Sequence, residues 1–597
     1  MGEGPLRTAG AGTLRAEDAG REVRLAGWVA ARRDHGGVMF VDLRDASGVS
    51  QVVIDPSTAM GADAHRLRDE YCIAVAGTVR LRGADNANPE MPTGAIEVEA
   101  ASLEVLSPSD PLPFRIDDRI DAEEVRRLEY RYLDLRRPRM AANLRARSAA
   151  IRAMRRALDG LDFLEIETPT LIRSTPEGAR DVLVPSRLRP GTFYALPQSP
   201  QLFKQLLMVG GVERYYQIAR CYRDEDFRAD RQLEFTQLDL EGSFWGRDDV
   251  LATLERVMVE VIRDLRGVEL ETPFPRLTYG EALARYGTDK PDTRFGMEIV
   301  ELNGVFAGSE FRAFRGAVDS GGLVAGIDAG SLGLSRSGLD GLVERAVALG
   351  ARGLVWIVVE EDGSLRSPTA KFFSDEERAG IVDAFGAVPG DTLLLVADAA
   401  PPTRAVLGQL RLELGKPERH DDLVFLWVID FPVFEVDAEG NYHPAHHPFT
   451  SPYSVTEMEQ DPANALSKAY DLVLNGSELG SGSVRIHDPE IQRRVFDVLG
   501  ILPDEAERRF GWFLGALRFG TPPHAGFAVG IDRLVSIIRN EPNIREVIPF
   551  PKTQSGVDPM TGSPTRVSDV QMAELGIDLR PQVRRRFEEE GEAPPAG

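Results

Sequence analysis

The chain has 597 residues, of which 43% are hydrophobic and 27% charged, and it carries a formal net charge of −24. This length predicts several domains, because single cores rarely grow beyond about 250–300 residues. The acidic balance argues against a uniformly basic nucleic-acid binder, although a basic stripe on an acidic body can still bind phosphates. Without a long apolar run, an N-terminal secretion signal or paired cysteines, the sequence predicts a cytoplasmic protein with no membrane span.

Residues 1–107 contain five predicted strands and one predicted helix, separated by Gly, Asp and Pro. The strands are expected at Val23–Ala30, Val38–Arg44, Val49–Asp55, Ile73–Leu81 and Ile96–Leu106, and the helix at Ala62–Glu70. This pattern is typical of a small closed β-barrel of the OB type, which often binds single-stranded nucleic acid through aromatic and basic side chains. The candidates for such a face are Arg32, Arg33, Phe40 and Gln51. A protein-interaction module of the same shape is the alternative.

Residues 108–140 are rich in Pro, Asp and Arg and are predicted to form a hinge. Its basic side chains either contact an RNA backbone or only solvate a linker. A helix is expected over 141–159, with an apolar stripe that includes Leu144 and Leu158, and with Gly160 ending it. In the segment that follows, Pro169 suits a sheet edge or an interface.

The stretch 214–241 predicts a long antiparallel hairpin. From Phe235 onward apolar and polar side chains alternate, which places three polar residues on one face: Gln237, Asp239 and Glu241. The strands are too apolar on their other side for a peripheral hairpin, and no lysine interrupts the acids and amides. The pattern therefore favours a binding face over a solvated one.

Residues 289–417 change to small residues with alternating strands and helices, among them a helix at 337–349 and a capping box from Ser374 to Glu377. This predicts an inserted α/β domain with a core of its own. Residues 558–597 are expected to hold one helix and then, from Arg584, a frayed end rich in Arg, Glu and Pro.

Three segments, in this order, carry a family resemblance. Phe163–Leu171, Arg223–Asp239 and Gly526–Leu534 resemble motifs 1, 2 and 3 of the class II aminoacyl-tRNA synthetases. The segments Gly178–Asp181, Gln198–Lys204 and His446–Thr450 are similar to the bacterial aspartyl-tRNA synthetases. The likeness runs from about residue 6 to 555.

The resemblance implies an α+β multidomain fold. Its parts would be an OB anticodon-binding domain at 1–107, a hinge at 108–140, an antiparallel-sheet catalytic domain in two pieces at 141–288 and 418–557, the insertion at 289–417 and a C-terminal extension at 558–597. It also implies a homodimer formed through the motif 1 segment.

The resemblance further implies a pocket for L-aspartate. A buried aspartate side chain needs a cation, and Lys204 and Arg485 are expected to supply two. Asp239 is expected to take the α-amino group, surrounded by the other aspartate-binding positions: Glu177, Gln201, Arg223, His446 and His447. Asparagine would leave both cations unpaired, which predicts its rejection by a factor on the order of 10⁴.

The implied reaction joins aspartate to the α-phosphate of ATP and then transfers the aspartyl group to the terminal ribose of tRNA. As catalytic residues, Arg223 is expected at the α-phosphate and Arg533, in the helix after Gly530, at the γ-phosphate. Asp471 and Glu478 flank a turn at Asn475-Gly476 and are expected to hold Mg²⁺, with Glu478 also contributing to catalysis. The other expected ATP contacts are Glu225, Gln232, Gly530, Ile531 and Asp532.

His35 departs from a common family pattern. Members restricted to tRNA-Asp typically carry Leu there, whereas histidine resembles relaxed members that also charge tRNA-Asn. The two anticodons differ at one base near this loop, where Phe40 and Gln51 are expected to stack on and bond to a base. The sequence thus predicts charging of both tRNAs. A strictly tRNA-Asp enzyme, in which His35 is an ordinary loop residue, is the first alternative.

Two alternatives belong to other functional classes. A ligase that forms asparagine from free aspartate is disfavoured by the N-terminal barrel and the hinge. An RNA-binding protein with an inactive catalytic domain is disfavoured because the reactive positions are all present: Arg223, Glu225, Glu478, Arg485 and Arg533.

Overall fold

The computed structural model describes residues 5–35, 37–119, 122–175, 179–225, 228–419 and 421–589. The chain divides into two compact units, residues 1–144 with 558–563 and residues 145–557 with 564–597. Every helix among the described residues is too short or too polar to cross a bilayer.

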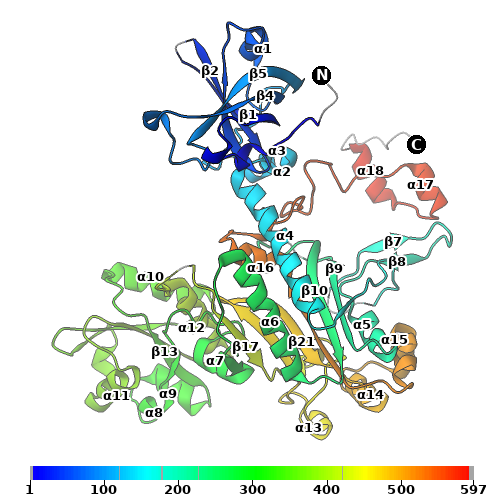
Figure 1. Ribbon diagram of the computed structural model, residues 1–597. Helices are drawn as coiled ribbons and strands as arrows, with labels where there is room; N and C mark the ends of the chain where they lie inside the picture. The colour runs from blue at the N-terminus through cyan, green and yellow to red at the C-terminus, as the bar shows by residue number, and fades with distance from the viewer. Residues whose placement is uncertain are drawn as a thin grey trace. The chain divides into compact units, whose positions relative to one another are not determined.

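The five N-terminal strands close into the predicted barrel (Figure 1). In barrel order they are β1 (Glu22–His35), β2 (Val38–Asp45), β3 (Gly48–Ile54), β5 (Ile96–Ser107) and β4 (Cys72–Leu81). Alternate residues, such as Leu25 and Val41, fill its apolar core. The helix α1 (Gly61–Arg66) ends four residues before the predicted boundary, because Leu67 turns to a more extended conformation and is buried in that core.

The predicted hinge contains two short helices, α2 (Glu124–Glu129) and α3 (Arg131–Asp134), around a buried ion cluster. The fully buried carboxylate of Asp134 accepts from the Nη1 atoms of Arg131 and Arg137, at 2.5 and 2.9 Å. These two arginines stabilise the hinge itself. Of the two alternatives left open for the basic residues of the hinge, RNA contact or a solvated linker, neither describes the buried Arg131 and Arg137.

A mostly antiparallel eight-stranded sheet forms the body of the second unit (Figure 1). In spatial order its strands are β11 (Arg276–Thr278), β17 (Phe425–Ile429), β20 (Ala469–Leu474), β21 (Ser477–Val484), β22 (His524–Gly530), β10 (Glu234–Ser243), β9 (Arg214–Tyr222) and β6 (Leu164–Glu165). The predicted hairpin is β9–β10. The motif 1 segment supplies the edge strand β6, and the motif 3 segment supplies the central strand β22.

One face of this sheet is apolar and covered by helices. The long helices α4 (Pro138–Asp159) and α6 (Arg247–Arg266) and the short α16 (Ile531–Ile538) pack on it over a core that includes Leu238, Trp427 and Phe527. The remaining elements of this body are α5 (Gln201–Val209), α7 (Tyr279–Tyr286), α13 (Val455–Gln460), α14 (Pro489–Val498), α15 (Pro503–Leu517) and the strand pairs β7 (Leu183–Pro185) with β8 (Phe193–Ala195) and β18 (Phe434–Val436) with β19 (Tyr442–Pro444).

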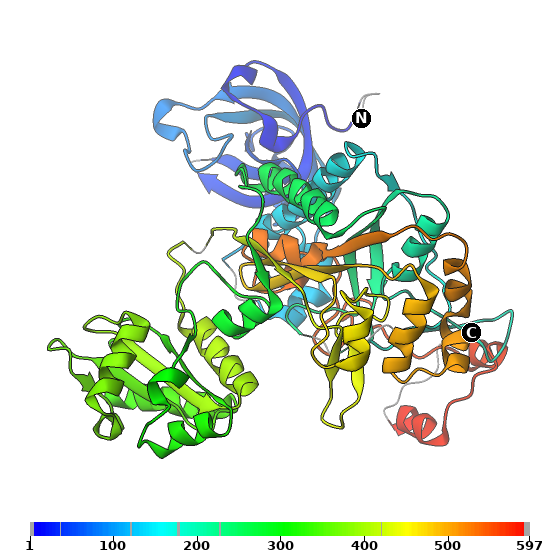
Figure 2. The same ribbon diagram turned by 90° about the horizontal axis from the view of Figure 1, so that it is seen from below.

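The insertion has a five-stranded sheet of its own, with helices on both faces (Figure 2). Its strands are, in order, β12 (Val300–Glu301), β13 (Leu323–Asp328), β16 (Thr392–Asp398), β14 (Val355–Val359) and β15 (Leu365–Arg366). Its helices are α8 (Asn303–Phe306), α9 (Arg312–Asp319), α10 (Arg336–Ala348), α11 (Asp375–Phe385) and α12 (Ala400–Leu414). The predicted capping box starts α11. Strands and helices alternate along the chain, yet every strand pairing in this sheet is antiparallel.

The C-terminal segment contains two helices, α17 (Asp569–Glu574) and α18 (Pro581–Glu589). The prediction that the chain frays from Arg584 is wrong up to Glu589. Pro581 begins α18, where a missing amide hydrogen costs nothing, and Arg584 lies 2.5 Å from the carboxylate of Asp578. The last eight residues lie outside the described part of the chain.

Candidate active site

A cavity of about 500 Å³ lies over the polar face of the eight-stranded sheet. It brings together most residues that the sequence predicts to bind aspartate, ATP or metal: Gln201, Lys204, Arg223, Glu225, Gln232, Asp239, His446, His447, Asp471, Glu478, Arg485, Gly530, Asp532 and Arg533. Ile531 is different, because its side chain is buried in the apolar core. Glu177 lies outside the described residues.

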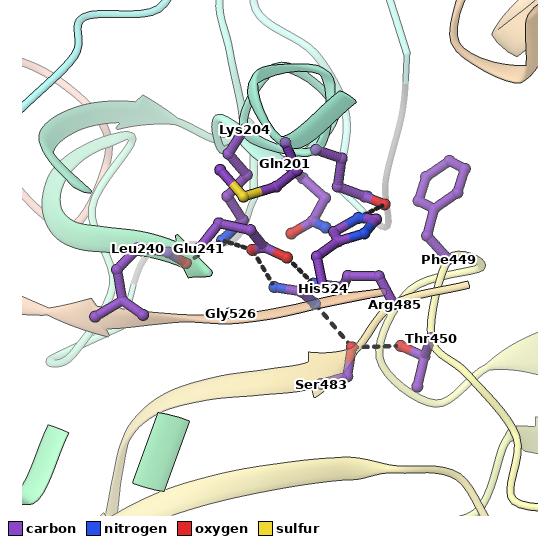
Figure 3. Close-up of polar contacts among 12 residues, drawn as sticks. Gln201, Lys204, Leu240, Glu241, Phe449, Thr450, Ser483, Arg485, His524 and Gly526 are labelled. Atoms are coloured by element: carbon purple, nitrogen blue, oxygen red, sulfur yellow. Dashed lines mark hydrogen bonds and ion pairs between the residues drawn. The ribbon is translucent and has the colours of Figure 1, made fainter. Parts of the chain in front are cut away.

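Lys204 and Arg485 line this cavity, and both contact one buried carboxylate, that of Glu241 (Figure 3). Arg485 Nε and Nη2 lie 2.9 and 3.1 Å from the two carboxylate oxygens of Glu241, and Lys204 Nζ lies 3.3 Å from Oε2 of the same residue. Lys204 Nζ also contacts Asp239 Oδ1 at 2.7 Å. All four side chains are at most 2% exposed. They form a buried cluster of two cations and two acids.

The two acids of this cluster differ in acidity. Burial opposes the ionisation of Glu241, but the charges of Arg485 and Lys204 outweigh it and hold the pKa of Glu241 below its ordinary value. For Asp239 burial prevails over the charge and the hydrogen bond of Lys204, and the nearby charge of Glu241 adds to it, so the pKa of Asp239 is raised. Glu241 is thus the ionised counterion, and Asp239 is the acid that gains more from another cation.

This arrangement corrects the argument about asparagine. The predicted 10⁴-fold rejection assumes that Lys204 and Arg485 have no other counterion, but both already pair with the single carboxylate of Glu241. An aspartate side chain must compete with Glu241 for the two cations, and the uncharged side chain of asparagine competes less well. The difference of one charge-assisted hydrogen bond at the upper end of its usual range, about 3 kcal/mol, corresponds to discrimination of about 10²-fold.

Three buried polar atoms of cavity-lining residues have no partner among the described residues: Asp239 Oδ2, Gln201 Nε2 and His446 Nδ1. Buried polar atoms are normally hydrogen-bonded, so unpaired ones in a cavity indicate the ligand that it accepts. Asp239 Oδ2 is an acceptor suited to an ammonium group, and Gln201 Nε2 is a donor. Together they fit an amino acid.

The neighbouring histidines have opposite tendencies. Burial opposes the protonation of His446, but the charges of Asp471 and Glu478 outweigh it and raise the pKa of His446 above its ordinary value. The nearer carboxylate oxygen, Asp471 Oδ1, lies 3.0 Å from His446 Nε2. Burial and then Arg485 lower the pKa of His447 far below it. His447 is therefore neutral and places Nε2 2.6 Å from Arg485 Nη1 as an acceptor.

The hairpin β20–β21 carries the two predicted metal-binding carboxylates. Asn475 and Gly476 both have positive φ, 50° and 78°, which confirms the tight turn. The register of the β20–β21 pairing shifts between Leu472 and Val473, which marks a β-bulge. The bulge keeps Glu478 on the same face as Ser481, and the Ser481 hydroxyl donates to Glu478 Oε1 at 3.2 Å. Ser481 in turn pairs with Asp471. Two carboxylates on one cavity face are oxygen ligands of the kind that Mg²⁺ prefers beside phosphates.

The two predicted phosphate-binding arginines differ in their surroundings. Arg223 lies over the ring of Phe235, 5.0 Å from its centre, and no carboxylate of the described residues pairs with it. Arg533 pairs with Asp230 Oδ2 at 3.0 Å. Glu225 accepts from Arg231 at 2.8 Å. Arg223 thus presents a fixed guanidinium plane with an unneutralised charge.

Two predicted ATP contacts have structural partners. The amide of Gln232 exchanges two hydrogen bonds with the backbone of Lys552, at 2.9 and 3.1 Å. Asp532 accepts from the Thr236 amide at 2.8 Å and from Arg147 on α4. Asp532 thus joins motif 3 to the motif 2 strand, and Gln232 joins the motif 2 loop to the segment at Lys552.

The candidate anticodon face lies on the barrel. Strand pairing places Arg33 opposite Phe40 and His35 opposite Val38, so these side chains share the outer face. Gln51 follows on β3, where it donates to Glu97 at 3.2 Å.

Arg32 does not share this face. It pairs with the inward-facing Val41 and donates to the carbonyl oxygens of His65 and Leu67 at 2.9 and 3.3 Å. The prediction that Arg32 belongs to this face is therefore wrong, because adjacent strand residues point to opposite sides of the sheet.

Two residues of the site had no predicted role. Glu241 was placed on the polar face of its strand, and its position two residues after Asp239 was a signal that it meets the same cations. Arg147 gave no signal, because only the fold brings α4 beside Thr236 and Asp532.

Replacing Gly526 with Ala is expected to lower the free energy of unfolding by about 2–3 kcal/mol, since a Cβ there would lie 1.9 Å from Glu241 Oε2 and 2.3 Å from the carbonyl oxygen of Leu240. Urea denaturation checks this. Gly304→Ala, at a position with open space, is the matched control. Equal stability of the two variants would contradict the described packing of Glu241.

The unfolding temperature is expected to fall as the pH falls below about 6.5. His524 is buried, and burial lowers its pKa from an ordinary value of 6.5, so the unfolded chain binds a proton that the folded chain does not. Each such histidine costs up to about 1.4 kcal/mol per pH unit in that window. Differential scanning fluorimetry at pH 7.5 and 5.5 tests this. His524→Gln should lose less stability over that interval, and an unchanged pH dependence would count against the buried neutral state.

Comparisons with known proteins agree with this architecture. Residues 123–554 match the family described as tRNA synthetases class II (D, K and N), and residues 23–106 match the OB-fold nucleic acid binding domain. A Salinispora tropica protein named "Aspartate--tRNA(Asp/Asn) ligase" is 52% identical over 605 residues, covering 99% of both chains. A Thermobifida fusca protein of the same name is 52% identical over 582 residues, covering 97% of this chain and 99% of its own.

Solved structures share the fold at low sequence identity. The asparaginyl-tRNA synthetase from Pyrococcus horikoshii complexed with asparaginyl-adenylate has a TM-score of 0.56 at 19% identity, covering 91% of this chain and 98% of its own. The aspartyl tRNA synthetase from Entamoeba histolytica has a TM-score of 0.56 at 20% identity, covering 92% and 91%. With the family match over more than half of its length, the chain belongs to the class II tRNA synthetases of the D, K and N group.

Proposed function

We propose that this protein ligates L-aspartate to tRNA-Asp and tRNA-Asn through an aspartyl-adenylate formed from ATP. The observation that carries the proposal is the buried meeting of Lys204 and Arg485 at Glu241, in the cavity that Arg223 also lines. A pair of buried cations that is shared with a single glutamate suits an acidic amino acid. The relatives at 52% identity carry the name of this activity.

In the first step the α-carboxylate of aspartate attacks the α-phosphorus of ATP, a P–O bond forms, and pyrophosphate leaves. Asp239 Oδ2 accepts from the α-ammonium group, and the side-chain carboxylate competes with Glu241 for Arg485. Arg223, which lies over the ring of Phe235, donates to the α-phosphate and stabilises the charge that develops there.

Asp471 and Glu478 would hold Mg²⁺, which supplies charge neutralisation of the nucleotide phosphates when bound. Arg533 donates to the γ-phosphate and gives up part of its contact with the half-exposed Asp230. In the second step a terminal ribose hydroxyl of tRNA attacks the aspartyl carbonyl carbon and AMP leaves. The leaving phosphate itself can take the hydroxyl proton, so no side-chain base is assigned.

The proposal includes a homodimer formed through the motif 1 segment. Its strand β6 is at the sheet edge, and Leu164 and Leu171 are 56% and 52% exposed. Exposed leucines at an unpaired edge favour contact with a second copy. Sedimentation velocity tests this, and a monomer at micromolar concentration would contradict it.

Aminoacylation of purified tRNA-Asp and tRNA-Asn with labelled aspartate tests the proposed function. Both tRNAs should be charged at comparable kcat/KM. A preference for tRNA-Asp beyond ~10³, about 4 kcal/mol, would leave only the strictly tRNA-Asp enzyme.

Replacing His35 with Leu is expected to raise the preference for tRNA-Asp over tRNA-Asn by about tenfold, or ~1.4 kcal/mol. His35 ends β1 on the outer face that it shares with Arg33 and Phe40, and it is exposed. The ratio of the two kcat/KM values measures the effect. Asp34→Asn, one residue earlier and on the opposite face, is the control. An unchanged ratio would show that His35 takes no part in the choice between the two tRNAs.

A further inference from the structure

The turn of the β20–β21 hairpin lies between the two chain segments that lead into and out of the insertion. On the outgoing side, Asn475 Oδ1 accepts from the Val424 amide at 2.9 Å and Asn475 Nδ2 donates to the Asp422 carbonyl at 2.7 Å. On the incoming side, Gly476 packs so closely that a Cβ there would lie 3.1 Å from Asp292 Cβ. The turn that precedes Glu478 is therefore held from both sides.

The incoming segment is fixed by an arginine of the insertion. Arg411, on α12, is fully buried, and its Nη2 donates to the carbonyl oxygens of Asp292, Phe295 and Gly296 at 2.7, 2.9 and 2.9 Å. Its guanidinium also lies 4.2 Å from the ring centre of Phe295 and 4.8 Å from that of Tyr286. No surface charge pair could hold three carbonyl groups in this way. Arg411 therefore fixes the backbone beside the turn.

A contact between two backbones fixes α12 itself. A Cβ at Gly408 would lie 2.7 Å from the Tyr286 carbonyl oxygen and 2.8 Å from that of Gly287, and a Cβ at Gly287 would lie 2.1 Å from the Arg404 carbonyl oxygen. The insertion thus docks on the end of α7 with no space for a methyl group, so a change in this docking is transmitted to the segment that Arg411 holds.

We propose that the insertion positions the metal- and nucleotide-binding hairpin, with Arg411 and the Gly287–Gly408 contact as its positioning elements. The chain of contacts runs from α12 through Arg411 to Asp292 and then to Gly476 in the turn between Asp471 and Glu478. The inference rests on the proposed function in one respect, since it takes these two carboxylates to bind the Mg²⁺ form of ATP.

A matched pair of Gly→Ala variants in two helices of the insertion tests the proposal. Gly408→Ala adds a methyl group against the Tyr286 and Gly287 carbonyls, whereas Gly341→Ala on α10 adds one in open space. The readouts are the calorimetric affinity for a non-hydrolysable ATP analogue with Mg²⁺, and hydrogen–deuterium exchange of peptides covering 469–484. Gly408→Ala should weaken the affinity about fivefold and speed the exchange of the turn, while Gly341→Ala changes neither.

Arg411→Met and Arg411→Lys supply an independent arm. Arg411→Met should raise the KM for ATP more than it lowers kcat, leave the affinity for aspartate alone unchanged, and speed exchange in the turn; Arg411→Lys should restore part of each. If Gly408→Ala and a folded Arg411 variant both keep wild-type analogue affinity and turn exchange, the proposal is overturned. Absence of aspartate-dependent activity in the wild type would defeat the proposed function instead, and the exchange data would still decide the positioning role.

Discussion

Replacing Arg485 with Leu is expected to lower kcat/KM for aspartate in ATP–pyrophosphate exchange by about 10³-fold. Arg485 donates two hydrogen bonds to the Glu241 carboxylate and one each to Ser483 and His447, so four of its five N–H groups have a partner. Its removal takes away the planar donor for the substrate carboxylate and leaves Glu241 with Lys204 alone. The same variant should lose about 3–5 kcal/mol of folding free energy, because a buried carboxylate is then only partly neutralised.

The double variant Arg485→Leu, Glu241→Leu separates these two effects. Removing both charges should recover much of the lost stability, since a buried ion pair replaced by apolar groups is often neutral for folding. It should not recover aspartate activation. Aspartate-dependent exchange within tenfold of wild type in the single variant would remove Arg485 from the substrate pocket.

Replacing Arg223 with Met is expected to reduce kcat for adenylate formation by about 10²–10³-fold with a smaller change in KM for ATP. The guanidinium is oriented on Phe235 and carries no carboxylate partner among the described residues, so its charge is available for the phosphorus centre as it becomes more negative. Pre-steady-state quench-flow measures this step directly.

Arg220→Met is the matched control for Arg223. Arg220 lies on β9, which ends one residue before Arg223, but its guanidinium pairs with Glu234 at 2.7 Å and donates to Thr236, away from the predicted α-phosphate position. Its substitution should change kcat less than about threefold, within the range of a surface ion pair. Equal losses in both variants would indicate a general effect on the hairpin and not a phosphate contact.

Much of the fold follows from the periodicity of the apolar residues and from the residues that begin and end helices and strands. The five barrel strands, α4, α10 and the motif 2 hairpin match their predicted spans to within a few residues at most boundaries, because each alternates or repeats its apolar residues clearly. Local signals also placed the Asn475-Gly476 turn and the capping box of α11. Gly and Pro fixed most of the remaining boundaries.

The features that could not be predicted from the sequence depend on the register between paired strands. A bulge near Ala30 decides that Arg33 and not Arg32 joins Phe40 on the outer face of the barrel, and another near Leu472 decides which side chains join Asp471. Neither bulge has a sequence signal in this chain. Similarly, the counterion role of Glu241 depends on how far α5 and β21 lie from β10, which only the packed sheet determines.

The amino-acid dependence of ATP–pyrophosphate exchange by the wild-type enzyme tests the central claim most directly. With aspartate, asparagine, glutamate and lysine supplied separately, we expect exchange with aspartate to exceed that with asparagine by about 10²-fold and exchange with lysine to be undetectable. Exchange with lysine, or equal exchange with asparagine and aspartate, would show that the cluster of Lys204, Glu241 and Arg485 does not select an acidic amino acid.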